Sequence, residues 1–241
     1  MDKKRTKSVE QQPGGSFDSM QRNPIYERLM NAIAEHRLHP GTKLAEDRLA
    51  AIFGVSRTVV RAVLQQLSHE LVVTMVPNRG AFIASPTVDE ARELFDARRQ
   101  IELPLVEKVC RCATKKHVAQ LRTHVAQEED ARARADRRAA VRLSGEFHVL
   151  LARISGNRFI ERMTRHLQML TCLTILLYNA PTAQACPHDE HAQLIDAIEA
   201  GDPKRAQKLM ETHLQHIEAT LHLHTADEEA DDLEAILLHG Q

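Results

Sequence analysis

The chain has 241 residues, of which 43% are hydrophobic and 27% are charged, and its formal net charge is −1. A chain of this length can bury a core large enough to fold without disulfides. Only 3% of the residues are aromatic and none is tryptophan, which argues against folds that stack bases of single-stranded nucleic acid on aromatic side chains. Glycine and proline, nine of each, are scarce for this length. We therefore expect a mainly α-helical protein.

The two ends of the chain differ in charge from the rest. Residues 1–21 are basic and lack the apolar stretch of a secretory signal, so we expect a disordered basic arm. Residues 226–241 predict an acidic tail. The longest nearly apolar run, residues 169–178, is too short to span a bilayer, and the four cysteines lack zinc-ribbon spacing. These features predict a cytoplasmic protein with reduced thiols and no membrane partner.

Three short helices are predicted in the first part of the chain. Apolar residues recur at helical spacing in three segments, residues 24–37, 46–53 and 56–69. Gly54 ends the second helix and Ser56 caps the third. The third helix buries one apolar stripe and leaves Arg57, Arg61 and Gln65 on the opposite face. A helix that exposes two arginines and a glutamine after a tight turn is typical of the reader in a helix-turn-helix protein.

A wing is predicted to follow these helices. Residues 71–76 and 81–84 favour two strands, and the turn between them carries an arginine. The pattern gives a winged helix-turn-helix domain over residues 22–86. The segment LAEDRLAAIFGVSRTVVRAVLQQLSHELVVTMVPNRGAFIA resembles the winged helix of GntR-type bacterial regulators, in which the VSR-x-x-VR core and the arginine-glycine wing tip are the most recognisable parts.

The resemblance implies a set of contacts with double-stranded DNA. Arginine fits O6 and N7 of guanine bidentately, and the resemblance places Arg57 and Arg61 in the major groove or against its phosphates. Asp47 stands where many relatives have a further DNA-contacting arginine, so Arg48 is included as a weaker contact. The implied DNA-binding residues are Arg48, Ser56, Arg57, Thr58, Arg61, Gln65, Arg79 and Gly80. The alternative is that these arginines form a solvated face.

The rest of the chain predicts an all-helical bundle over residues 87–225. Helical segments are expected at residues 88–112, 115–134, 137–155, 158–179, 188–200 and 203–224. The apolar residues of the fourth segment are expected to belong to the core, namely Met163, Leu167, Leu170 and Leu177.

Histidines are the unusual feature of this second part. His191 lies 10 residues before Gly201 and His213 lies 12 residues after it, so a helical hairpin at that glycine brings the two nearly level. His148, on the third helical segment, can add another imidazole to the same core. Three imidazoles with open coordination positions suit zinc, nickel or another borderline divalent ion.

Three segments of this part resemble the FCD effector domain of the FadR-like branch of GntR regulators: LFDARRQIE, EFHVLLARISGN and DEHAQLIDAIEAGDPKRAQKLMETHL. The resemblance implies a divalent metal held by His148, His191 and His213, with Ser144 in the position of the usual aspartate. It also implies that Arg98 and Asn157 approach the effector. Because Ser144 lacks a carboxylate, three alternatives stay open: a metal site, histidines that bind an organic anion directly, and structural histidines. For Arg98 the alternative is a helix-surface pair with Glu102.

Together these features predict a DNA-binding transcriptional regulator rather than an enzyme. We expect a repressor that binds a pseudo-palindromic operator as a homodimer. Its effector is expected to be a small organic acid, a carboxylate-like metabolite bound in the histidine-lined pocket. The alternatives are a metal-dependent hydrolase that uses the three histidines, and a structural DNA-binding protein that senses nothing.

Overall fold

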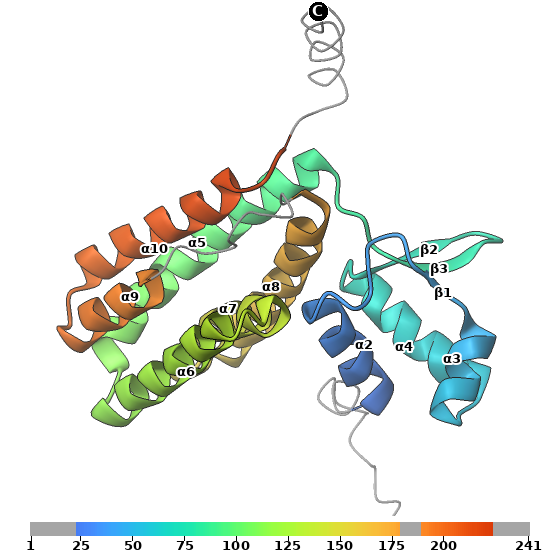
Figure 1. Cartoon of the computed structure of the whole chain (residues 1–241), viewed down its shortest axis with the longest axis horizontal. Helices are drawn as coiled ribbons and strands as arrows, with labels where there is room; N and C mark the ends of the chain where they lie inside the picture. The colour runs from blue at the N-terminus through green and yellow to red at the C-terminus, as the bar shows by residue number, and fades with distance from the viewer. Residues whose placement is uncertain (1–22, 179–188, 224–241) are drawn as a thin grey trace, which may run out of the picture.

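A computed structural model of the chain describes residues 23–178 and 189–223. Figure 1 shows two parts side by side, a small head with a short sheet and a larger bundle of long helices. The predicted basic arm and acidic tail lie outside the described residues. The fold class predicted from the sequence, a winged helix-turn-helix followed by an all-helical bundle, is confirmed.

Among the residues that the structure describes, the head comprises three helices and a three-stranded sheet. Its elements are α2 (Pro24–Ala34), β1 (Lys43–Leu44), α3 (Glu46–Phe53), α4 (Arg57–His69), β2 (Val73–Val76) and β3 (Gly80–Ile83). The strand order is β1-β3-β2 with antiparallel pairing, and Ala81 lies between Leu44 on one side and Met75 on the other. The sequence predicted the two wing strands but not β1, which is too short to show an alternating pattern.

Local signals in the sequence set the ends of the head helices. Asn23 accepts a hydrogen bond from the backbone of Ile25 and begins α2, which stops three residues before its predicted end because His36 takes a left-handed conformation with φ 54°. Gly54, with φ 66°, ends α3. Ser56 Oγ then accepts from the Val59 amide at 3.4 Å and begins α4. This tight turn fixes α4 relative to α3.

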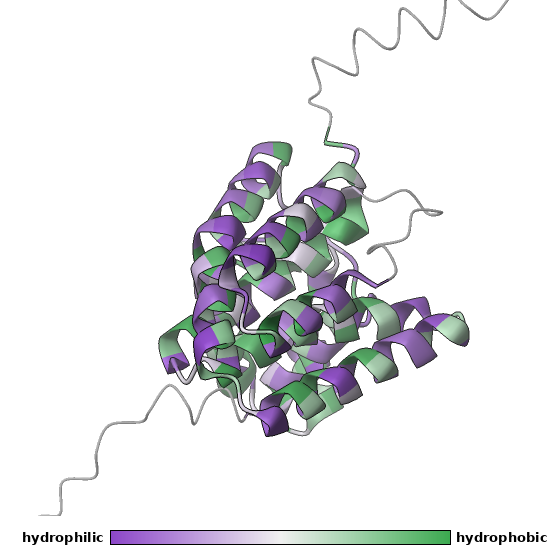
Figure 2. Ribbon diagram, turned by 90° about the vertical axis from the view of Figure 1, so that its left-hand side faces the viewer, coloured by the Kyte–Doolittle hydropathy of each residue, from purple (hydrophilic) through white to green (hydrophobic). Residues whose placement is uncertain are grey.

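The described part of the bundle contains six helices, five of them within two residues of their predicted bounds, whereas α10 ends five residues before its predicted end. They are α5 (Val88–Cys112), α6 (Lys115–Ala133), α7 (Arg137–Ile154), α8 (Arg158–Tyr178), α9 (Glu190–Glu199) and α10 (Pro203–Ala219). Hydrophilic and hydrophobic residues alternate along the helices (Figure 2), as expected where one face of each is buried. None of the helices in the described parts of the chain is long and apolar enough to cross a membrane.

Helix α8 belongs to both parts of the molecule. Leu173 is fully buried within the hydrophobic core of the head, and Met169 and Leu170 pack against that core. Another face of α8 is buried in the bundle and is unusually polar, with Thr164 and Gln168 one helical turn apart. One helix therefore connects the core of the head with the interior of the bundle.

The prediction of core residues on α8 is wrong in part. Met163 and Leu177 are 51% and 40% exposed, and Leu167 and Leu170 are only half-buried. The buried positions include polar residues instead, namely Thr164, Gln168, Thr171 and Thr174. The helix is rotated relative to its apolar stripe because it meets the head on one side and a polar interior on the other.

Candidate functional site

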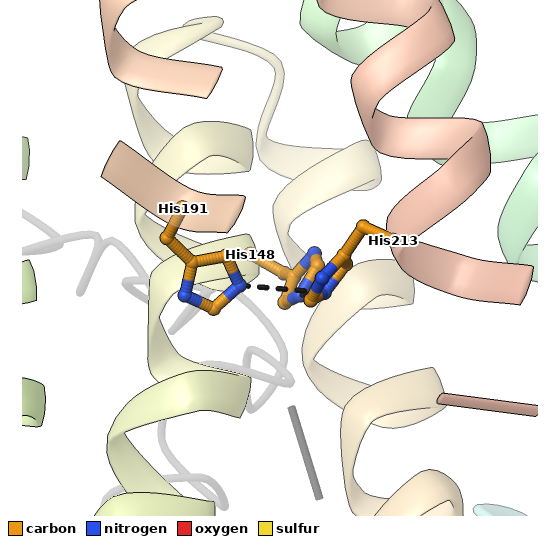
Figure 3. Close-up of side chains that lie close together, drawn as sticks. All are labelled: His148, His191 and His213. Carbon is orange, nitrogen blue, oxygen red and sulfur yellow. Dashed lines mark hydrogen bonds between the residues drawn. The ribbon is translucent and has the colours of Figure 1, made fainter. Parts of the chain in front are cut away.

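Three buried histidines meet in the interior of the bundle. His148 comes from α7, His191 from α9 and His213 from α10, and their rings face one another (Figure 3). Nε2 of His213 lies 3.2 Å from Nε2 of His148 and 3.3 Å from Nε2 of His191. The hairpin between α9 and α10 does turn at Gly201, with φ 63°. The structure therefore brings together the three histidines that the sequence singled out.

Each of the three imidazoles has a glutamate at its other nitrogen. Nδ1 of His191 donates to Glu128 Oε2 at 2.9 Å, and Nδ1 of His213 donates to Glu190 Oε2 at 2.7 Å. Nδ1 of His148 lies 2.5 Å from Glu102 Oε2. The three glutamates come from different helices: Glu102 from α5, Glu128 from α6 and Glu190 from α9. Because an ionised carboxylate only accepts hydrogen bonds, the contacts with Glu128 and Glu190 place a proton on Nδ1 of His191 and on Nδ1 of His213.

With Nδ1 protonated, the Nε2 lone pairs of His191 and His213 face each other across 3.3 Å. A divalent cation relieves the resulting repulsion, and histidine ligands with a carboxylate at the second nitrogen are typical of zinc sites. Two nitrogens at about 2.05 Å from a tetrahedral zinc ion stand about 3.3 Å apart. Two of the three separations, 3.2 and 3.3 Å, are close to that value, and the candidate ligand atoms of all three rings lie within 4.8 Å of one another, so the residues present suit a divalent metal.

The protonation states of these groups also suit a cation. Burial, together with the neighbouring histidines, lowers the pKa of His213 well below its ordinary value, and burial lowers the pKa of His148 as well. Burial alone would raise the pKa of Glu102, but Arg98 and His148 outweigh it and lower that pKa to about 2. The cluster at neutral pH therefore contains neutral His148 and His213 rings beside an ionised carboxylate, as metal binding requires.

The charges around the histidines sum to a negative value. Glu102, Glu128 and Glu190 contribute three negative charges. Arg98 pairs with Glu102, and Arg132 pairs with Glu128. Glu190 contacts His213 and the exposed His216. With the histidines counted as neutral, the three glutamates and two arginines carry a formal charge of −1, which a bound divalent ion would change to +1. A bound metal would then favour an anionic ligand.

Arg98 is a fully buried guanidinium with part of its donor set unused. Its Nε donates to Glu102 Oε1 at 2.7 Å. Its Nη1 and Nη2 have no hydrogen-bond partner among the described residues. Leaving charged donors unpaired in a protein interior is costly, and the planar fork matches a carboxylate. Arg98 does pair with Glu102, but the expectation of a pair on the helix surface is wrong, because both side chains are fully buried. The approach of the outer edge of Arg98 to an effector stays a prediction.

The other two residues predicted to contact the effector are Ser144 and Asn157. Ser144 is half-buried on α7, one helical turn before His148. Asn157 Oδ1 accepts from the backbone amides of Phe159 and Ile160, at 3.0 and 3.3 Å. Its side chain thus caps the start of α8, and its approach to the effector stays a prediction.

Sequence analysis missed several polar residues of this site. Glu128 stands in a charged run on α6, and Glu190 precedes His191 directly, so neither is distinguished by its spacing. Gln168 Nε2 donates to Glu102 Oε1 at 3.2 Å. Thr164 Oγ1 is fully buried without a hydrogen-bond partner in the described parts of the chain. The only available signal was the four-residue spacing of Arg98 and Glu102.

All eight residues predicted to bind DNA are exposed on the head: Arg48, Ser56, Arg57, Thr58, Arg61, Gln65, Arg79 and Gly80. In the wing, the Arg79 guanidinium lies 5.7 Å from the centre of the Phe82 ring. Asn78 and Gly80 take positive φ values of 60° and 98°, which shape the tip. The exposure of this set is compatible with DNA contact, which stays a prediction.

Two domain families match the chain. Residues 93–216 match the FCD domain, and residues 21–83 match the family of bacterial regulatory proteins called gntR. The chain belongs to the GntR family. Its C-terminal FCD domain is consistent with the FadR-like branch that the sequence resembles.

This GntR-family chain is similar to transcription regulators over most of its length. It is 29% identical over 226 residues to an uncharacterised HTH-type transcriptional regulator of Streptomyces ambofaciens, covering 91% of this chain and 87% of the relative. It is 27% identical over 222 residues to the HTH-type transcriptional repressor NanR of Salmonella newport, covering 82% and 84%. The matched families and relatives are regulators and not enzymes, as predicted, so the hydrolase alternative is set aside.

Two solved structures share the fold. A GntR transcriptional regulator from Rhodococcus superposes with a TM-score of 0.72 at 25% identity, covering 84% of this chain and 96% of that one. McbR/YncC of E. coli superposes with a TM-score of 0.73 at 19% identity, covering 81% and 93%. The chain therefore shares its overall fold with both of these proteins.

Proposed function

We propose that this GntR-family regulator is a cytoplasmic repressor that binds a pseudo-palindromic operator as a homodimer and responds to a small organic acid. The acid binds in the bundle, beside a divalent metal held by His148, His191 and His213. Arg98 clamps the carboxylate of the acid. The name of the Salmonella relative, a transcriptional repressor, supports the direction of regulation.

The observation that carries the effector proposal is the buried guanidinium of Arg98 beside the histidine cluster. Its two outer nitrogens are unpartnered among the described residues. A bound divalent ion would also make the formal charge of the surrounding glutamates and arginines positive. Zinc or nickel bound to three imidazoles keeps open coordination positions. Ser144, half-buried one turn before His148, cannot supply a charged ligand there. A carboxylate oxygen of the effector is the complement to both the metal and Arg98.

Helix α8 supports a route from the effector to DNA. Gln168 contacts Glu102, which pairs with Arg98. On another face of the same helix, Leu173 lies in the core of the head. A displacement of α8 by the effector would therefore move the head, and in a dimer it would change the separation of the two recognition helices. The effector can shift this equilibrium only by its difference in affinity for the two arrangements.

The exposed residues of α4 and the wing support operator binding. Ser56, Arg57, Thr58, Arg61 and Gln65 lie along α4 and its cap, with Arg48 on α3 and Arg79 and Gly80 in the wing. We expect Arg61→Ala to weaken operator binding by about 1 to 3 kcal/mol, because an exposed donor is removed and no core contact is lost. A homodimer sets the spacing of two such heads on the two half-sites.

The effector proposal is tested by metal analysis and acid titration on the full chain. Zinc and nickel content is measured for the wild type, for His191→Ala and for His39→Ala, in which an exposed histidine outside the site is removed. A panel of mono-, di- and tricarboxylic acids is then titrated by thermal shift. Arg98→Lys keeps the charge beside Glu102 but removes the fork, and Arg99→Lys, a neighbour paired with Asp96 and Glu218, is its control.

The proposal expects metal loss only in His191→Ala and loss of the acid response in Arg98→Lys but not in Arg99→Lys. Acid binding by a wild-type protein that retains neither metal would show that the histidines bind the organic anion directly. A protein that binds neither metal nor acid would be a DNA-binding protein without an effector, which contradicts the proposal.

A further inference from the structure

Arg61 on the exposed face of α4 is held by an acidic residue of α3. Its Nε donates to Glu46 Oε1 at 2.9 Å and its Nη2 donates to Glu46 Oε2 at 2.7 Å. The Arg61 side chain is 54% exposed, whereas the Glu46 side chain is only 17% exposed. The half-buried carboxylate is thus a fixed support for a side chain that would otherwise sample many rotamers.

The geometry of this pair leaves the useful edge of the guanidinium available. The carboxylate occupies the side-on edge, which is formed by Nε and one hydrogen of Nη2. The end-on edge, formed by Nη1 and the second hydrogen of Nη2, is not used by Glu46. Two parallel N–H donors on that edge match O6 and N7 of guanine. The contact with Glu46 therefore orients Arg61 without consuming the donors that read a base.

The same arrangement pairs the two arginines at the start of α4 with two carboxylates of α3. Arg57 lies 3.0 Å from Asp47 and 3.6 Å from Glu46. Two arginines thus face two carboxylates, and their formal charges cancel. Phosphate attraction supplies most non-specific binding to DNA, so a neutral surface contributes little to it. Hydrogen bonds to base edges contribute sequence preference instead.

We propose that Glu46 is a positioning residue that aims Arg61 at a guanine and limits binding to DNA of unrelated sequence. This inference rests on the proposed DNA-reading function of α4, and it assigns to an acidic residue a role in specificity that its charge alone would oppose. Asp47 contacts Arg57 through a single pair of atoms, and both side chains are exposed, Asp47 by 76%. Glu46, by contrast, holds Arg61 through two hydrogen bonds. Asp47 is therefore the matched control for the charge.

The test compares the affinity for two DNA probes under one salt concentration. The specific probe is a duplex that the wild-type full chain selects from a random-sequence library, and the non-specific probe is the unselected library. Glu46→Gln removes the charge and one acceptor oxygen. Glu46→Asp keeps the charge but shortens the reach to Arg61, and Asp47→Asn removes the same charge one residue away. Each Glu46 variant is also combined with Arg61→Ala.

The ratio of specific to non-specific affinity is the decisive quantity. We expect it to fall about tenfold in Glu46→Gln, because a bidentate arginine–guanine contact discriminates by about that factor or more. In Asp47→Asn both affinities rise together and the ratio is kept. In Glu46→Asp the ratio falls while the non-specific affinity stays at the wild-type level. In the Arg61→Ala background, both Glu46 substitutions leave the ratio unchanged.

Two results overturn the inference in distinguishable ways. A wild-type chain that selects no sequence from the library would refute the DNA-reading function, and this inference with it. A wild-type chain that does select a sequence, but whose ratio is unchanged in Glu46→Gln and in Glu46→Asp, would refute the positioning role alone. Repeating the selection with Glu46→Gln adds a second readout: the preference at one base position of each half-site is lost and the others remain.

Discussion

Glu128 holds His191 in the orientation that metal binding requires, so replacing its carboxylate should weaken metal binding while the bundle stays folded. Glu128 is 1% exposed, accepts from His191 Nδ1 at 2.9 Å and pairs with the half-buried Arg132. Glu128→Gln is nearly isosteric and keeps an amide oxygen for the same N–H. The substitution therefore removes the negative charge behind the ring more than it changes the geometry.

The expected loss follows from this single contact. Carboxylates that accept from a metal-bound histidine contribute about 10- to 100-fold to metal affinity. Because the amide oxygen of the variant still accepts, we expect the lower end, about tenfold. At a free zinc concentration of about 100 times the wild-type Kd, bound zinc stabilises the wild type by about 2.7 kcal/mol. The variant, at about 10 times its own Kd, gains about 1.4 kcal/mol by the same relation.

The assay is a zinc competition titration against a chromophoric chelator, followed by urea denaturation with and without zinc. Glu146→Gln is the control, because Glu146 is an exposed glutamate on α7 that pairs with Arg142 instead of a histidine. Equal zinc affinity in the wild type and Glu128→Gln would refute the role of Glu128. A loss of the same size in Glu146→Gln would show that general charge, rather than the contact with His191, determines the affinity.

Three further predictions concern other parts of the molecule. Ser144→Asp should raise zinc affinity by roughly tenfold, because a carboxylate that only hydrogen-bonds to a metal ligand already contributes that much. An unchanged rate of zinc loss to a chelator would contradict this. Burial, with Arg137 nearby, lowers the pKa of His36 from 6.5 to about 4, so the native state binds fewer protons than the unfolded state in that range and stability is lost as pH falls from 6.5 toward 4. Asparagine suits the positive φ and does not titrate, so the free energy of unfolding of His36→Asn should rise relative to that of the wild type by about 1 kcal/mol as the pH falls from 7.5 to 5. This is about half the full linkage value, because the ring is partly exposed. A difference in the free energy of unfolding that is independent of pH in urea denaturation would refute it. Leu173→Ala should cost about 2 to 5 kcal/mol and speed amide hydrogen exchange in α4 more than in α6, and equal acceleration in the two helices would contradict the shared core.

The elements that the sequence predicted correctly are those with local signals. Gly54 and Ser56 define the turn before α4 through a left-handed φ and a cap, and both act within a few residues. The strand β1 was missed because its pairing with β3 depends on residues about forty positions away. The buried face of α8 was misassigned for a similar reason. Met163 and Leu177 continue an apolar stripe, but two different neighbours determine which side of that helix is covered.

The candidate site shows the same division between local and long-range information. His191 and His213 were placed level by counting residues on both sides of Gly201, since helix geometry converts sequence distance into position. The glutamates behind the rings come from other helices, and Glu128 is one of several acidic residues on α6. Periodicity does not reveal which of them turns inward. The interior of the bundle, with its buried charges, becomes apparent only when the helices are assembled.

Because α8 packs against both the head and the bundle, it also restricts how heads can be exchanged between such proteins. A chimera joined at Pro86 would place a foreign head against Leu173, Met169 and Leu170, which fit the core of the present head. Tyr178 Oη donates to the carbonyl of Pro86 at 2.8 Å, so the joint itself contacts the end of α8. A working exchange of heads should therefore carry the head-facing residues of α8 along with residues 23–86. In this fold, the residues that must be transferred together with the DNA-binding head come from two separate stretches of the sequence.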